Sequence, residues 1–185
     1  MLSGRASVDL PADPAATEAF GQWLGERLRP GDTLALVGGL GAGKTTLVRG
    51  LAGGLRVDDP DAVQSPTYLL VVEHPGPVPL LHADAYLPAK LEGFLADGGL
   101  EYLFDARAVV AVEWADRVRR LLPARTLWLE LALAPGGGRH LRLACADAAA
   151  FAFLADLPAR FPFLPSTAAD PANGPAASPA PPKCR

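Results

Sequence analysis

Residues 38–45 have the types and spacing of a loop that can wrap a phosphate group. They read GGLGAGKT, which matches the pattern G-x-x-x-x-G-K-[ST]. The glycines let backbone N–H groups turn inward around phosphate oxygens, and a helix beginning at this point would add partial positive charge. In such a loop Lys44 can reach the outer phosphates of a nucleotide, and Thr45 can offer its hydroxyl to Mg²⁺. The sequence therefore predicts a site for a nucleotide with its magnesium ion.

Two carboxylates stand at the ends of apolar runs, where a metal–nucleotide site needs them. AVVAVE ends in Glu113 after five apolar residues, and LLHAD ends in Asp84. We expect Glu113 to be the second anchor of the metal, and Asp84 to orient an attacking water or hold a metal-bound water. The plainer alternatives are that Glu113 only marks where a strand reaches solvent and that Asp84 caps a turn.

The expected nucleotide is ATP. A guanine site of the small G-protein kind needs an N-K-x-D motif, and the one Asn of this chain, Asn173, is not in such a motif. Residues 63–68, VQSPTY, could form a loop whose two hydroxyls cover the outer phosphate, although an ordinary turn entering a strand is the simpler interpretation from these residues alone. We interpret His82 as a histidine satisfied within a strand rather than as a catalyst.

These groups need secondary structure to position them. A strand is expected at residues 33–38 before the phosphate loop, and a helix after it, TTLVRGLAGGL, stopped by Gly53-Gly54. An earlier helix is expected to begin with Asp13 as N-cap and Pro14 in its first turn. Further strand candidates are residues 68–72, 78–84 and 108–114 and the pair TLWLELAL and RHLRLAC around the turn 135–138; residues 87–96 and 115–122 are expected to be helical.

This order of elements predicts the α/β class. We expect a P-loop NTPase-like three-layer fold with a mixed, largely parallel sheet and a C-terminal hairpin. A chain of 185 residues is long enough for one such domain. We assign residues 1–163 to this P-loop ATPase domain and residues 164–185 to a disordered Pro/Ala-rich tail.

Charge and hydropathy exclude several classes of protein. Seventeen basic and 20 acidic residues give a net charge of −3 without a polybasic run, which argues against a protein that binds DNA through its phosphate backbone. No segment approaches the roughly 20 apolar residues of a membrane span. We therefore expect a cytoplasmic protein with no membrane contact.

Four segments follow one another along the chain: GGLGAGKTTLVRGLAGGL, SPTYLLV, H-x-D-x-Y at residues 82–86, and VEW at residues 112–114. Together they resemble the TsaE family, also called YjeE, over about residues 10–145. That family comprises small bacterial P-loop ATPases required for the threonylcarbamoyl modification of adenosine 37 (t6A37) in tRNAs that read ANN codons. One departure is Leu87, which stands where the family usually has the arginine of D-L-Y-R.

The resemblance implies a role for each matching residue. Lys44, Asp84 and Glu113 would be the catalytic groups, and Thr45 and Glu113 would bind Mg²⁺. Ser65, Pro66 and Thr67 match the switch-like loop of the family, and Trp114 matches the tryptophan that follows the metal-binding glutamate. The nucleotide contacts would come from Leu40, Gly41, Ala42, Gly43, Lys44, Thr45, Asp84 and Arg139.

The resemblance also implies an ATPase cycle. The protein would hydrolyse ATP slowly alone, bind the TsaD–TsaB transferase pair and reset it between turnovers, meeting tRNA only through that pair. Hydrolysis needs little beyond positioning and charge neutralisation, so Lys44, Mg²⁺ and one water-orienting carboxylate suffice.

Two alternatives remain at this point. The first is a small-molecule or nucleoside kinase, for which Arg107 and the arginines within residues 117–125 are the candidate lid. The second is a nucleotide-responsive binding module without meaningful hydrolysis.

Overall fold

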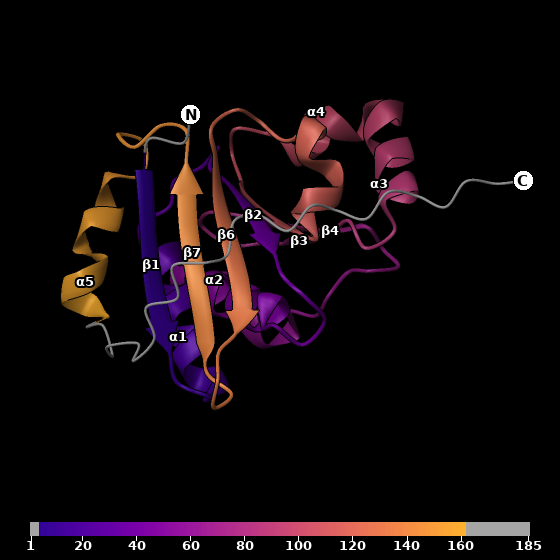
Figure 1. Ribbon diagram of the computed structural model, residues 1–185. Helices are drawn as coiled ribbons and strands as arrows, with labels where there is room; N and C mark the ends of the chain where they lie inside the picture. The colour runs from indigo at the N-terminus through magenta and orange to yellow at the C-terminus, as the bar shows by residue number, and fades with distance from the viewer. Residues whose placement is uncertain (1–3, 162–185) are drawn as a thin grey trace, which may run out of the picture.

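The strands of the computed structural model, which describes residues 4–161, form one sheet in the order β1-β7-β6-β2-β5-β4-β3 (Figure 1). Their bounds are β1 (Gly4–Leu10), β2 (Thr33–Val37), β3 (Val71–His74), β4 (Leu80–Asp84), β5 (Val109–Glu113), β6 (Thr126–Leu133) and β7 (Arg139–Cys145). The four central strands β6, β2, β5 and β4 are parallel; β7 pairs antiparallel with β6 and β3 with β4, and β1 pairs antiparallel with β7. The expected mixed sheet and the β6–β7 hairpin are confirmed.

Helices cover both faces of this sheet. They are α1 (Pro14–Gly25), α2 (Lys44–Leu55), α3 (Pro88–Phe94), α4 (Leu100–Leu103) and α5 (Leu157–Arg160), with the short 3-10 helices η1 (Pro60–Ala62), η3 (Ala115–Leu121) and η4 (Ala152–Asp156) and the π-helical segment η2 (Leu95–Gly99). The sheet separates two apolar cores, and successive residues of β2 face one core and then the other. Leu34 and Leu36 pack with α1 and α2, whereas Ala35 packs with residues of α3, α4 and η3. This arrangement makes the three layers that the sequence predicted.

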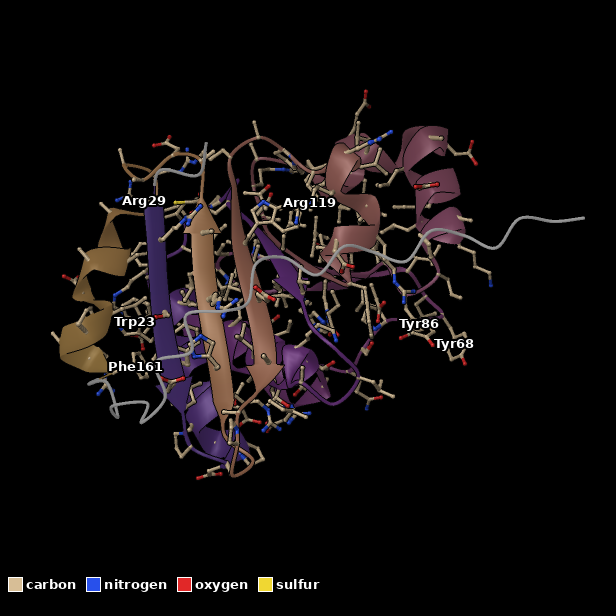
Figure 2. The ribbon with its side chains drawn as sticks, viewed as in Figure 1. Trp23, Arg29, Tyr68, Tyr86, Arg119 and Phe161 are labelled. Carbon is tan, nitrogen blue, oxygen red and sulfur yellow. The ribbon has the colours of Figure 1, made fainter. Side chains whose placement is uncertain are left out.

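Local signals placed the first helix correctly. Asp13 is the N-cap of α1, where its side chain accepts a hydrogen bond from the backbone N–H of Ala15 at 3.0 Å, and Pro14 opens the helix. At the other end of the described chain, Trp23 of α1 packs edge-on against Phe161, with ring centroids 5.8 Å apart (Figure 2).

Several expected boundaries were wrong. β1 was not expected, because GRASVDL carries only a weak alternating pattern and its partner β7 lies more than 130 residues away. Residues 68–70 turn before β3 begins at Val71, and Leu70 has a positive φ of 69° there. Residues 115–121 are helical as expected, in the form of a kinked 3-10 helix.

Gly53 and Gly54, expected to stop α2, lie in its last turn, and Gly54 serves helix packing together with Gly50. A Cβ at Gly50 or Gly54 of α2 would overlap the carbonyl oxygen of Glu18 or Gln22 of α1. Gly21 and Gly25 of α1 face the backbone of α2 in the same way. Two backbones can approach this closely only where neither carries a side chain, so the glycine spacing fixes how α1 and α2 lie against each other.

The assignment of residues 164–185 to a tail lies outside the described residues and stays a prediction. Within residues 4–161, none of the helices is long and apolar enough to cross a bilayer.

We predict that Gly50→Ala destabilises the protein by about 3 kcal/mol, because the added methyl group must push α1 away from α2. Gly53→Ala is the matched control. It makes the same change in the same helix, but nothing lies within 4 Å of its new methyl group. We expect Gly53→Ala to stabilise the protein by about 0.5 kcal/mol. Urea unfolding of both variants measures the difference, and equal effects would show that the helix contact tolerates a side chain.

Candidate functional site

The phosphate-loop pattern lies between β2 and α2, as the sequence predicted. Gly43 precedes α2 with φ 101°, a left-handed conformation that favours glycine, and no side chain caps the helix there. The loop opens onto a cavity of about 390 Å³. Leu40, at the rim, is 88% exposed, whereas Ala42 is buried beneath the loop. The first N–H groups of α2 are therefore free of any side-chain cap at the mouth of a cavity, which suits an anion.

Lys44 is held by the loop itself. Its ammonium donates to the carbonyl oxygens of Gly38 and Gly39 at 2.8 and 2.9 Å and lies 3.9 Å from the centre of the Trp114 ring. Burial lowers the pKa of Lys44, and the nearby carboxylate of Glu113 opposes that shift. The two loop carbonyls occupy two of the three N–H donors of this ammonium, so Lys44 can direct the third at a phosphate and can exchange the carbonyls for further phosphate oxygens.

Glu113 ends β5 beside the phosphate loop and is buried. Its Oε1 accepts a hydrogen bond from the Thr45 hydroxyl at 2.8 Å and lies 3.0 Å from Nε2 of His82. Parallel pairing of β4 with β5 sets Asp84 directly opposite Glu113. The two carboxylates that the sequence singled out therefore lie side by side at the carboxyl ends of neighbouring strands, where open α/β sheets bind ligands.

Asp84 anchors the candidate switch loop. Its Oδ2 accepts hydrogen bonds from the hydroxyls of Ser65 at 2.6 Å and Thr67 at 2.8 Å, and its Oδ1 accepts from the backbone N–H of Tyr86 at 2.7 Å. Pro66 lies between the two hydroxyls and accepts a backbone hydrogen bond from Leu70. The Ser65–Thr67 hydroxyls are therefore attached to the site through one carboxylate, and the backbone N–H of Asp84 holds the end of the segment by donating to the Leu70 carbonyl at 3.0 Å.

Two aromatic side chains flank this carboxylate edge. Tyr68, which follows the Ser65–Thr67 loop, is 85% exposed, and Figure 2 shows it on the outside of the molecule. Tyr86 packs edge-on against Trp114, with ring centroids 5.3 Å apart. Trp114 has a positive φ of 55°, a conformation that costs free energy in a residue with a side chain and that concentrates at functional sites.

Arg117 places a guanidinium beside these rings. It lies 4.7 Å from the centre of Trp114 and 4.9 Å from that of Tyr86, and it donates to the Tyr86 carbonyl. Leu87 stands where the family usually has an arginine. In this chain η3 instead brings the guanidinium of Arg117 to the backbone of the preceding residue, Tyr86. Sequence reasoning had placed Arg117 only among candidate lid arginines.

Arg139 reaches the phosphate loop from the start of β7. Its Nε donates to the Ala42 carbonyl at 2.9 Å, and the same guanidinium bonds the carbonyl of Gly137. It thereby ties the hairpin turn to the loop and lines the cavity.

The structure brings most of the predicted site residues to one cavity. Its lining includes Leu40, Gly41, Gly43, Lys44, Thr45, Ser65, Thr67, Glu113, Trp114 and Arg139, joined by Asp13, Pro14, Thr17, Thr46 and Tyr86. Asp84 stands behind the two loop hydroxyls, and Ala42 and Pro66 act through their backbones. The contact of His82 with Glu113 was missed, although its position two residues before Asp84 on one strand puts both side chains on the same face.

The oxygen groups here suit a magnesium ion bound together with a nucleotide. Within residues 4–161, no three His, Cys, Asp or Glu side chains gather as a protein-only metal centre. Mg²⁺ at a nucleotide takes several ligands from phosphates and water and needs only one or two protein oxygens, which Thr45 and Glu113 offer 2.8 Å apart. The residues present therefore fit the ion.

Comparison with known proteins decides the family. A family model described as "Threonylcarbamoyl adenosine biosynthesis protein TsaE" matches residues 11–140. The chain belongs to the TsaE family. It is 35% identical to the TsaE protein of Treponema pallidum over 128 residues, covering 69% of this chain and 93% of that protein, and 35% identical to the TsaE protein of Bacillus subtilis over 130 residues, covering 70% and 79%.

A solved structure agrees. The crystal structure of Bacillus subtilis YdiB superposes with a TM-score of 0.67 at 27% identity, covering 86% of this chain and 97% of that one. The fold is that of a P-loop NTPase, and the family is a nucleotide-binding one named for tRNA threonylcarbamoyladenosine biosynthesis. The family resemblance and the fold class expected from the sequence are thus confirmed.

We predict that Asp84→Ala releases the Ser65–Thr67 loop, because two hydroxyls lose their shared acceptor. Hydrogen exchange of the amides in residues 65–70 should quicken by about tenfold. Asp105→Ala is the control, since it breaks an exposed pair with Arg107 away from the loop. Unchanged exchange in Asp84→Ala would show that the loop is held by something other than this carboxylate.

Proposed function

We propose that this protein is a Mg²⁺-dependent ATPase of tRNA t6A37 modification that binds and resets the TsaD–TsaB transferase pair. The observation that carries the proposal is the convergence of Lys44, Thr45, Glu113 and the Asp84-bound loop on one cavity at the carboxyl ends of parallel strands. The pathway in this proposal is taken from the family, which is named for tRNA threonylcarbamoyladenosine biosynthesis. ATP is the proposed nucleotide, the cytoplasm the proposed compartment, and contact with tRNA occurs through the pair.

In this proposal the phosphates lie over the loop. Residues 40–45 surround them with backbone N–H groups, Lys44 exchanges its bonds to Gly38 and Gly39 for phosphate oxygens, and Arg139 adds charge at the rim. When bound, Mg²⁺ neutralises developing charge on the phosphates, with Thr45 and Glu113 as its protein partners.

Asp84 orients the attacking water. Its two oxygens already accept three hydrogen bonds from the protein. Two of these bonds come from the Ser65–Thr67 loop. These three hydrogen bonds leave one of the roughly four lone-pair positions of the carboxylate, on Oδ1, for a water, so the Ser65–Thr67 loop shares Asp84 with the attacking water and its position influences hydrolysis. Slow turnover by the isolated protein follows, and a partner that moves the loop would change the rate.

The test is ADP release from Mg²⁺-ATP by the purified protein, alone and with the TsaD–TsaB pair added. Turnover that changes when the pair is added supports the proposal. Turnover that ignores the pair, with no complex formed, rejects the partner role, and a phosphorylated acceptor appearing with the ADP would identify a kinase. If a complex forms only with nucleotide and no ATP is hydrolysed, the result supports the alternative of a nucleotide-responsive binding module.

We predict that Lys44→Ala abolishes ATP binding and reduces ADP release to background, because the cation nearest the loop is lost. Lys90→Ala, which removes an exposed lysine of α3, should change neither quantity. Equilibrium binding of a fluorescent ATP analogue measures the affinity, and unchanged affinity in Lys44→Ala would reject the phosphate-loop assignment.

We predict that substitutions of Glu113 and Asp84 change different steps, Mg²⁺ binding and ATP hydrolysis respectively. Glu113→Ala should raise the Mg²⁺ concentration needed for half-maximal turnover, whereas Asp84→Ala should leave ATP affinity unchanged and slow hydrolysis at least about a hundredfold. Magnesium titrations of ADP release, with ATP binding measured alongside, distinguish these effects. The reverse pattern would mean that the two roles are exchanged.

A further inference from the structure

Within residues 4–161, the side chain of His82 makes one hydrogen bond, and that bond is to the proposed metal-binding carboxylate. Its side chain is fully buried in β4, and its Nε2 lies 3.0 Å from Oε1 of Glu113. A carboxylate oxygen accepts, so His82 donates from Nε2. Its other ring nitrogen, Nδ1, is buried and has no partner among the described residues.

That unpartnered nitrogen is informative. Burying a polar atom without a hydrogen bond costs free energy, and an apolar side chain would fill this position in the core at lower cost. The ring does not serve the sheet, since its backbone neighbours pair in the ordinary way. What the imidazole adds to this position is the single donor that it directs at Glu113.

The bond to His82 fixes how Glu113 is presented. Oε1 receives two donors, the Thr45 hydroxyl at 2.8 Å and the His82 ring at 3.0 Å, from two different elements. Two bonds on one oxygen restrict rotation of the carboxylate and leave Oε2 without a partner within residues 4–161, in a side chain that lines the cavity. Thr45 is itself a proposed metal ligand, so His82 is the partner of Glu113 that stands outside the proposed metal set.

We propose that His82 is a positioning residue that holds Glu113 in the orientation needed for Mg²⁺ bound with the nucleotide. This inference rests on the proposed function. In this role His82 does not contact ATP. Its loss therefore lowers the affinity of the site for Mg²⁺ and leaves the affinity for the nucleotide alone unchanged. Partners that orient metal-binding side chains in this way typically contribute 10- to 100-fold to metal affinity.

Two amide substitutions make a matched test. The side-chain nitrogen of Gln stands where Nε2 of His stands, so His82→Gln keeps a donor near Glu113. The shorter Asn places its nitrogen near the position of Nδ1, so His82→Asn stays polar but loses the reach. Binding of a fluorescent ATP analogue is measured in EDTA and then over a Mg²⁺ titration.

We expect His82→Asn to raise the Mg²⁺ concentration for half-maximal enhancement of binding about tenfold, with affinity in EDTA unchanged. His82→Gln should restore the wild-type value. His74→Asn is the control for loss of a buried imidazole, because His74 lies on the neighbouring strand, with its ring centroid 6.0 Å from that of His82, and makes no bond to Glu113. If His82→Asn does not fold, His82→Phe removes the donor while filling the space.

The outcomes separate this inference from the proposed function. A wild-type protein whose nucleotide binding does not respond to Mg²⁺ rejects the proposed metal site itself. A wild-type response that His82→Asn or His82→Phe leaves unaltered rejects only the role of His82. The same substitution in a Glu113→Ala background should produce no further increase, because His82 acts through Glu113; a further tenfold increase would show a structural effect and overturn the inference.

Discussion

The site depends first on the register of three parallel strands. β2 runs directly into the phosphate loop, and in the paired strands Leu36 lies opposite Glu113 while Glu113 lies opposite Asp84. Side chains at matching positions of parallel strands point to the same face of a sheet. Both carboxylates are therefore directed toward the beginning of α2, where Thr45 stands. A slip of one residue between β4 and β5 would turn one carboxylate to the opposite face and dismantle the site.

The close contact of α1 with α2 adds a second constraint. The cavity lies between the start of α2 and the start of α1, which contributes Asp13, Pro14 and Thr17 to its lining. Glycines on both helices let their backbones meet, so the width of this cavity follows from helix packing rather than from the phosphate loop alone. Arg139, at the start of β7, lines another side of the cavity and donates to the carbonyl oxygen of Ala42 in the phosphate loop.

The sequence was most informative where function and local structure coincide. Lys44 and Thr45 were recognisable because their pattern is contiguous, and Asp84 and Glu113 because each ends an apolar run. β1 was missed because its pairing partner is remote in the sequence, and Gly54 of α2 was interpreted only as a stop because its contact with α1 cannot be seen within its own segment. The bonds of His82 to Glu113 and of Ser65 and Thr67 to Asp84 join separate elements, so no pattern within one segment shows the bonds themselves, although the two-residue spacing of His82 and Asp84 places both on one face of β4.

The polar groups of the site are already bonded to the protein itself. Lys44 bonds the carbonyls of its own loop, and Asp84 bonds the hydroxyls of Ser65 and Thr67. A nucleotide gains only the difference between its own contacts and those it replaces. In the proposed cycle the phosphates therefore replace the bonds of Lys44 to its own loop, whereas the Ser65–Thr67 loop bonds the carboxylate that orients the attacking water. A partner that holds this loop away from Asp84 would change the rate of hydrolysis and leave nucleotide affinity unchanged, and the exposed side chains of Tyr68 and Leu69, which follow the loop, are available for such a partner to contact.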